Sequence, residues 1–168
     1  MYFQNLKSLK KEDKLRKNFS DDLIADVLKK LDEWLISMNE YMTYRLNPKQ
    51  FAIQKNVNFQ VAKSIFLAGA NSEIFEMYFE VRSDDNEYLD QISREKYINL
   101  VRGQNMLMYS MDEDRDIEIS VHNVEIWFQL NIKPEGIPAF FEKNKEGEVK
   151  GLSSADLTEE ELDAWFDR

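Results

Sequence analysis

The sequence predicts an α+β protein in which helices come first along the chain and an antiparallel sheet follows. Between residues 20 and 68, apolar side chains recur every three or four residues, which is the period of an amphipathic helix. From residue 74 to residue 132, apolar and polar side chains alternate in several short runs, which is the period of a half-buried strand. Clusters of Asn, Asp and Gly between these runs indicate turns.

Composition narrows the class of protein. The chain has 168 residues, of which 43% are apolar and 32% charged, and this suits one globular domain or two small ones. It contains no cysteine, so a disulfide framework and a thiolate metal site are excluded, and a cytoplasmic location is expected. No apolar run approaches the roughly 20 residues of a membrane span, and the N-terminus has no apolar signal-peptide core. We therefore expect no membrane association.

Charge is unevenly distributed along the chain. The net charge is −10, but residues 1–70 hold 12 Lys and Arg against 8 Asp and Glu, whereas residues 71–168 hold 10 against 24. A chain of this kind can approach nucleic acid through its basic end, or its acidic excess simply keeps it soluble. Residues 1–19 are predicted to be a basic N-terminal arm, formed either as a loose helix or as a poorly ordered terminus.

Residues 20–45 give the clearest helix prediction. Ser20 is a suitable N-cap, and Asp21 and Asp22 suit the positive end of the helix dipole. The apolar stripe is wider than a two-stranded coiled coil needs. Either it packs on two sides within the chain, or one side packs on a protein partner or a second copy. The candidate partner-binding residues of this helix are Trp34, Met38, Tyr41 and Met42.

Two shorter helices and a strand follow. Asn47 and Pro48 suit the start of a helix over 48–55, and Asn58 suits the start of a helix over 59–68 that stops at Gly69. The expected inner faces hold Phe51, Ala52, Ala62, Ile65 and Phe66. Residues 74–82 alternate as a strand, 83–86 form a turn, and 87–92 return as a second strand.

The order of a helix, a tight turn, a second helix and a strand resembles the second half of a winged helix-turn-helix. The resemblance covers about residues 20–92. Winged-helix modules read nucleic acid in some proteins and only dock partners in others. Similar modules occur in accessory subunits of chromosome-maintenance and phage-defence complexes, and the resemblance implies that kind of setting.

The remaining chain, residues 93–168, is predicted to be an acidic antiparallel sheet region that ends in a helix. Ser93 suits the start of a helix over 94–102 that ends at Gly103. Strands are expected over 105–111, 117–121 and 124–132, followed by a loop-rich connection over 133–156. A capping-box pattern predicts a last helix over 159–167. Its Trp165 and Phe166 either pack on the chain's own core or bind a partner.

The sequence offers little catalytic chemistry, so we predict that the chain is not an enzyme and needs no cofactor, metal or small-molecule ligand. The single histidine, His122, lies in an expected turn, and no G-x-S-x-G nucleophile elbow is present. Asp112, Asp114 and Asp116 begin like a calcium loop, but Ile117 and Asn123 then break the pattern. Neither glycine-rich phosphate-binding motif occurs, and the E-x-K tripeptide at 148–150 is too common to indicate a nuclease.

The preferred function is an accessory subunit that docks a protein partner, or a second copy of itself, through the apolar helix and the winged-helix surface. The main alternative is a DNA-binding regulator that places the second helix of 48–68 in the major groove. Its candidate nucleic-acid contacts are Lys49, Lys55, Gln60, Lys63 and Ser64. The acidic turn at 84–87 argues against DNA, because phosphate contacts need Lys or Arg there. A third hypothesis is that the acidic residues 71–168 mimic nucleic acid.

Overall fold

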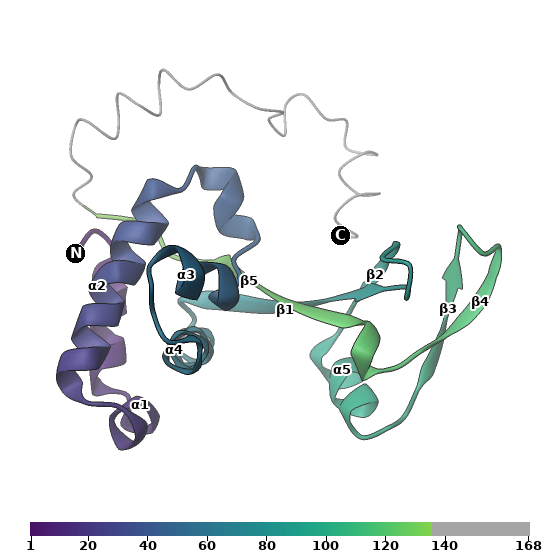
Figure 1. Cartoon of the computed structure of the whole chain (residues 1–168), viewed down its shortest axis with the longest axis horizontal. Helices are drawn as coiled ribbons and strands as arrows, with labels where there is room; N and C mark the ends of the chain where they lie inside the picture. Colours follow the sequence, from purple (N-terminus) through teal and green to yellow (C-terminus); the bar gives the residue numbers. More distant parts are fainter. Residues whose placement is uncertain (136–168) are drawn as a thin grey trace. The chain divides into compact units, whose positions relative to one another are not determined.

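A computed structural model describes residues 1–135 and has the predicted α+β fold. The described chain forms two compact units, residues 1–78 with 126–135, and residues 79–125. The chain leaves the first unit within strand β1 (Phe75–Arg82) and returns within strand β5 (Val124–Leu130), as can be followed in Figure 1. This division differs from the predicted boundaries after residues 19 and 92, because a late strand completes the early unit.

The N-terminal residues are an integral part of the first unit. They form the 3-10 helix η1 (Gln4–Lys11) and the α-helix α1 (Asp13–Asn18), and Leu6, Leu9 and Leu15 are buried. Leu6 and Leu9 are three residues apart, which matches the three-residue turn of a 3-10 helix. The segment is helical, as one of the two alternatives had it, but the expectation that it is loose or poorly ordered is wrong. Its leucines are few, but they share the face that packs on the core.

The helix predicted over 20–45 is divided in two. Ser20 caps α2 (Asp21–Ser37) as expected, but the helix ends at Ser37 and the 3-10 helix η2 (Glu40–Tyr44) follows. The Ser37 hydroxyl donates to the Trp34 carbonyl, and the Asn39 side chain accepts from the Met42 N–H to start η2. Ser and Asn side chains that bond to nearby backbone compete with a continuous helix. The periodic stripe alone could not reveal this break.

The two shorter helices form as predicted. Helix α3 (Pro48–Gln54) and helix α4 (Phe59–Asn71) begin at Asn47 and Asn58, whose side chains accept from backbone N–H groups of the first turn. Such caps satisfy donors that have no partner inside the helix. The predicted inner residues of both helices are buried.

Gly69 does not end α4, contrary to prediction. The helix continues to Asn71, and the left-handed residue that follows it is Glu73, with φ of 59°. A Cβ atom placed on Gly69 would lie 2.5 Å from Cδ2 of Phe75. The glycine is therefore required by the close approach of helix α4 to the start of β1, because any larger residue would overlap the ring.

Aromatic rings fill the centre of the first unit. Phe66 stacks on Phe75 with ring centroids 4.8 Å apart, and Phe128 lies edge-on to Phe66 at 5.2 Å. Phe51 contacts Trp34 at 5.2 Å and Phe66 at 6.0 Å. These rings come from α2, α3, α4, β1 and β5, so one cluster joins the helices to the strands.

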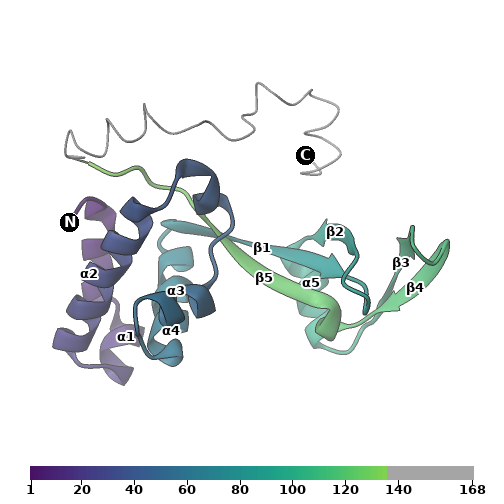
Figure 2. The same cartoon turned by 45° about the horizontal axis from the view of Figure 1, so that its top comes forward.

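The strands of the first unit come from distant parts of the sequence. The sheet order is β2-β1-β5, and β1 and β5 run side by side in both Figure 1 and Figure 2. The Asn131 N–H donates to the Ile74 carbonyl at 2.9 Å, beside the start of β1. Leu46, between η2 and α3, forms an antiparallel bridge with Phe128 of β5. The first unit therefore contains an isolated β-bridge residue between its second and third α-helices.

The second unit consists of short, well-capped elements. Strand β2 (Tyr88–Ile92) pairs antiparallel with β1, and α5 (Arg94–Val101) is capped by Ser93 and followed by Gly103 at φ of 84°. Strands β3 (Met106–Ser110) and β4 (Arg115–Ile119) form a separate antiparallel hairpin, followed by the 3-10 helix η3 (Val121–Asn123). These elements confirm the predicted helix and the strands expected over 87–92 and 105–111, whereas the strand expected over 117–121 begins and ends two residues earlier, and Val121 lies in η3. The buried apolar residues here are Phe79, Val81, Ile92, Leu100 and Ile119.

Two predictions concern the chain ends and the membrane. Within residues 1–135, no helix has the length and apolar character needed to cross a membrane. The helix predicted over 159–167, with Trp165 and Phe166, lies outside the described residues.

Candidate interaction surfaces

Trp34 is part of the core of the first unit. Its side chain is 2% exposed, and its Nε1–H donates to Oε1 of Gln54 at 2.6 Å. Tryptophan is commonly buried with its N–H hydrogen-bonded, as here. The hypothesis that Trp34 binds a partner is therefore corrected, and for this residue the alternative of packing within the chain holds. Met38 is half-buried and packs against the same core.

The other partner-binding candidates of this region lie on η2 and are exposed. Tyr41, Met42 and Tyr44 have exposed fractions of 52%, 46% and 48%, and we call these three residues the η2 patch. Tyr41 and Tyr44 lie three residues apart in a 3-10 helix, so they share one face. The Tyr78 hydroxyl donates to the Tyr44 carbonyl at 2.8 Å, which brings β1 against the end of η2. Tyr44 was absent from the sequence-based candidates because the predicted continuous helix hid the 3-10 spacing.

Arg45 and Trp127 add a cation–π pair to this region. The guanidinium carbon of Arg45 lies 3.8 Å from the centroid of the Trp127 ring, within the range of a cation–π contact. Arg45 follows Tyr44 directly in the sequence, and Trp127 is on β5. Trp127 alternates with the apolar residues at 124, 126, 128 and 130, so a large aromatic residue on the other face of the strand was the available signal in the sequence.

Two of the candidate nucleic-acid contacts come together. The ammonium nitrogens of Lys49 on α3 and Lys63 on α4 lie 5.8 Å and 5.7 Å from the centroid of the Phe59 ring. Gln60, the next residue on α4, is exposed. Phe59 therefore joins the first turns of both helices in one small basic and aromatic cluster. It was missed because it was expected only to begin a helix.

Other residues of α3, α4 and the connection between them make this surface less basic. Lys55 and Ser64 are half-buried, whereas Ile53 and Leu67 are exposed. An exposed isoleucine and leucine do not bind phosphate, and phosphate contacts supply most non-specific affinity for nucleic acid. They are compatible with the apolar centre of a protein interface.

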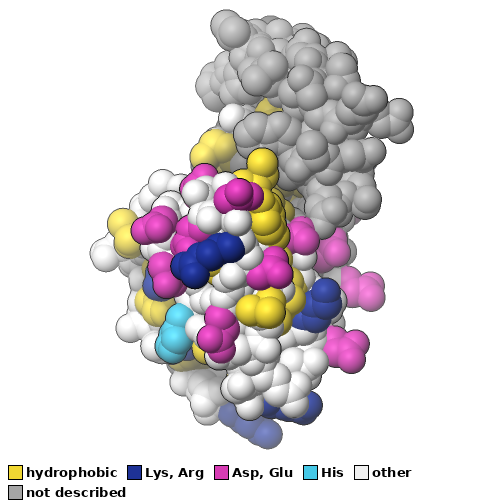
Figure 3. All heavy atoms as spheres, turned by 90° about the vertical axis from the view of Figure 1, so that its right-hand side faces the viewer, with side chains coloured by type: hydrophobic (Ala, Val, Ile, Leu, Met, Phe, Trp, Pro, Cys, Tyr) yellow, Lys and Arg dark blue, Asp and Glu magenta, His cyan; other side chains and the backbone are white. Residues whose placement is uncertain are grey.

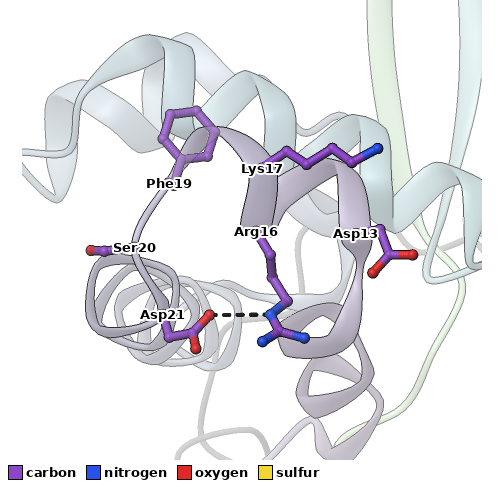
Figure 4. A pocket seen from close by; sticks show the side chains of 6 residues that line it. All are labelled: Asp13, Arg16, Lys17, Phe19, Ser20 and Asp21. Atoms are coloured by element: carbon purple, nitrogen blue, oxygen red, sulfur yellow. Dashed lines mark hydrogen bonds and ion pairs between the residues drawn. The ribbon is translucent and has the colours of Figure 1, made fainter.

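A shallow hollow lies beside α1 and the start of α2, as Figure 4 shows. In it, Nε of Arg16 faces Oδ1 of Asp21 at 3.3 Å, and the Ser20 hydroxyl points away because it caps α2. No residue lining this hollow pairs a nucleophile with a general base. The full set of lining residues is Asp13, Arg16, Lys17, Phe19, Ser20 and Asp21.

Glu87, the last residue of the acidic turn at 84–87, makes internal hydrogen bonds, whereas residues 84–86 are exposed. The Glu87 carboxylate accepts from the Ser110 hydroxyl at 2.6 Å and from the backbone N–H groups of Met111 and Asp112 at 2.9 and 3.3 Å. The hydrogen bond from Ser110 is the main reason that the pKa of Glu87 lies below its ordinary value. We call these contacts the Glu87 anchor, since they attach the β1–β2 loop to the β3–β4 turn.

Other polar residues of the second unit also have structural partners. The Asn123 amide donates to the Arg82 carbonyl and to Oδ1 of Asp84, each at 3.0 Å. Asp114 accepts from the Tyr109 hydroxyl, and its neighbour Asp116 lies opposite Tyr109 in the hairpin. Within residues 1–135, no group of three or more His, Asp or Glu side chains is arranged to hold a metal ion.

Comparisons of the chain with protein-family models, with curated proteins and with solved structures find no match.

Proposed function

We propose that the chain is a non-catalytic interaction subunit that docks a protein partner through the η2 patch of its first unit. The observation that carries the proposal is the group of half-exposed side chains Tyr41, Met42 and Tyr44 on one short helix. Aromatic residues, Met and Arg are enriched at protein interfaces, whereas Lys and Glu are depleted. Tyr and Trp present a large contact area at a small cost in side-chain entropy.

The surroundings of the patch support a preformed surface. Asn39 caps η2, and the Tyr78 hydroxyl binds the Tyr44 carbonyl, so both ends of the short helix are held. The Arg45 and Trp127 pair beside it offers a planar cation and an aromatic ring, the types of residue that dominate binding energy at interfaces. A surface that is ordered before binding loses less entropy when the partner arrives.

The proposal keeps the winged-helix interpretation of about residues 20–92, with β5 added beside β1. Four residues, 55–58, connect α3 to α4, which is the length expected of a helix-turn-helix. Helix α2 precedes this pair, and the paired strands β1 and β5 follow it. In this interpretation the exposed Ile53 and Leu67 belong to a protein-docking surface, in the reducing environment that a chain without cysteine suits.

Photo-crosslinking in cells that express the protein tests the proposal. Benzoylphenylalanine at position 41 or 44 should give a discrete protein adduct on irradiation, and the same probe at the exposed Lys29 of α2 should not. Mass spectrometry identifies the adduct as another protein or a second copy. Equal yields from all three positions, or no adduct from 41 and 44, would refute the proposal. Light scattering of the purified chain separates a monomer from a homodimer.

DNA binding is the second candidate, and the convergence of Lys49 and Lys63 on Phe59 favours it. Duplex binding should then weaken as salt rises and be lost in Lys63→Glu but kept in Lys29→Glu. Fluorescence anisotropy at two salt concentrations measures both effects. If micromolar protein does not bind a duplex at low salt, this candidate is removed.

A further inference from the structure

The β3–β4 hairpin of the second unit has two faces of different character. In its antiparallel register, Met106 pairs with Ile119 and Met108 with Ile117. Directly paired residues share a face of the sheet, so these four side chains lie together, and all are buried or half-buried. These four residues form the inner face of the hairpin, which is less exposed than the opposite face.

The outer face is unusually apolar along one strand and acidic along the other. Leu107 is 67% exposed and Tyr109 54%, and Met111, which follows β3, is 82% exposed. Their partners on β4 are Glu118, opposite Leu107, and Asp116, opposite Tyr109. We call these five residues the hairpin face. It places an apolar row beside a row of negative charge.

The rest of the second unit is also acidic and also exposes apolar side chains. Residues 79–125 hold 5 Lys and Arg against 12 Asp and Glu, a net charge of −7. Figure 3 views the molecule from the side on which β3 and β4 lie in Figure 1, and it shows apolar side chains among many acidic ones. Monomeric proteins seldom expose grouped apolar side chains without a binding role.

The hairpin face is also held in place. The Glu87 anchor binds the residues that end β3 and begin the turn, and the Tyr109 hydroxyl donates to Asp114. At the other end, the Asn105 amide donates to Glu118 at 2.9 Å. These bonds orient members of both rows before any partner is present, which lowers the entropic cost of binding.

We propose that the hairpin face binds an amphipathic helix of another protein, one that carries Lys or Arg beside its apolar stripe. Neighbouring strands lie about 4.8 Å apart, and a helix with its side chains is about 10 Å wide. One helix therefore covers both rows, placing apolar residues on Leu107, Tyr109 and Met111 and cations on Asp116 and Glu118. The hairpin face belongs to the second unit, whereas the η2 patch belongs to the first.

Charge selects this occupant over two others. The same face of a second copy would bring Asp116 and Glu118 toward like charges, which costs energy in a low-dielectric interface. The sequence of 159–167 in this chain is also acidic, with five Asp and Glu residues and no Lys or Arg. A basic helix from another protein is the partner that both rows complement.

Fluorescence anisotropy with the full chain and a labelled model peptide tests the proposal. The probe is an 18-residue peptide of Leu and Lys arranged with helical periodicity. Two controls accompany it, one with Glu in place of every Lys and one with the same Leu and Lys residues in scrambled order. We expect binding of the first peptide and at least tenfold weaker binding of both controls, as an estimate from the size of hot-spot effects.

Variants locate the site. Leu107→Asn and Asp116→Lys should each weaken binding about tenfold. The matched controls Val101→Asn and Glu95→Lys change an exposed apolar and an exposed acidic residue of α5, and they should bind as the wild type does. Circular dichroism confirms that each variant is folded, and because Leu107 and Asp116 are exposed, folding should be kept.

Four results would overturn the proposal. One is equal binding of the Leu and Glu peptide, and another is equal binding of the scrambled peptide, which would indicate unspecific attraction. The third is unchanged binding in both hairpin variants. Light scattering that shows a dimer lost in Leu107→Asn would instead assign the face to a second copy. None of these results depends on the η2 patch, so the proposed function can fail or stand independently.

Discussion

The two units of the molecule use different forces to hold their elements together. In the first unit, Phe66 contacts four other rings, and helices, strands and the N-terminal leucines all meet at one apolar core. In the second unit, the apolar core is small, and polar side chains join the loops. Arg82 lies 3.4 Å from the buried Glu80 and 3.3 Å from Glu125, and Glu87 anchors the hairpin turn.

This difference shows that core size alone does not decide which apolar residues stay exposed. The core of the first unit buries Trp34, which the helical pattern alone offered to a partner, while Ile53 and Leu67 of the same unit stay exposed. The second unit, whose elements are joined by polar bonds, also leaves apolar residues outside, in the hairpin face. Apolar packing is insensitive to pH, whereas carboxylate hydrogen bonds are not. The two units should therefore respond differently to the same perturbations.

The largest expected effect is in the core of the first unit. Phe66→Ala should lower the free energy of unfolding by about 3–5 kcal/mol, because it removes a ring that other rings surround. Urea unfolding followed by tryptophan fluorescence measures the loss, since Trp34 lies 6.3 Å from the Phe66 ring. The exposed Ile53→Ala is the control and should change stability by less than about 0.5 kcal/mol. Similar losses in both variants would contradict the central role of the ring cluster.

Gly69→Ala should cause the next largest loss in the free energy of unfolding. The added Cβ would lie 2.5 Å from the Phe75 ring, so overpacking should cost about 1–3 kcal/mol although alanine favours a helix. A double-mutant cycle with Phe75→Leu sharpens the test, because the smaller side chain should relieve part of the overlap. Strictly additive effects, or a stabilised single variant, would show that Gly69 does not serve this close approach.

A substitution of Asp32 tests whether hydrogen bonds, in addition to apolar packing, attach the N-terminal residues to the first unit. Its buried carboxylate accepts from the N–H groups of Tyr2 and Phe3 at 2.9 and 2.7 Å. Asp32→Ala should cost about 1 kcal/mol or more by leaving these donors without a partner. Hydrogen exchange should show faster exchange near the N-terminus, whereas Glu33→Ala, on the exposed face of α2, should not change it.

The smallest effect should be the loss of the Glu87 anchor. The pKa of Glu87 is lowered by its hydrogen bonds, so its stabilising effect is present above the ordinary value of 4.5. That effect should disappear as pH falls through the lower pKa of the folded state, because the protonated acid is a weaker acceptor. Amide exchange at Met111 and Asp112 should therefore increase in acid.

Glu87→Gln separates this carboxylate from other groups that titrate in acid. At neutral pH it should already show the faster exchange that the wild type shows in acid, and its exchange should depend less on pH. Glu95→Gln, an exposed change on α5, should keep the wild-type profile. If the wild type and Glu87→Gln have the same profile, the anchor does not hold the hairpin.

Local sequence was sufficient for much of the fold. Ser20, Asn47, Asn58 and Ser93 begin their helices as predicted, because an N-cap bonds to backbone N–H groups only two or three residues ahead. The alternating runs form strands for a similar reason, since side chains on successive residues of a strand point to opposite faces. Of the proposed surfaces, local sequence supplied Tyr41, Met42, Lys49 and Lys63, but not the contacts that group them.

The tertiary structure decided the rest, because the deciding contacts join residues that are far apart in sequence. Whether Gly69 ends a helix or admits a ring depends on Phe75, and whether Trp34 faces a partner depends on Gln54 and Phe51. The role of Glu87 depends on Ser110, which belongs to another strand. The amino-acid sequence by itself therefore determined the α+β class, the helix starts and the strand faces of this protein. Long-range packing decided the cases that the local pattern left open, such as the burial of Trp34 and the exposure of Leu107.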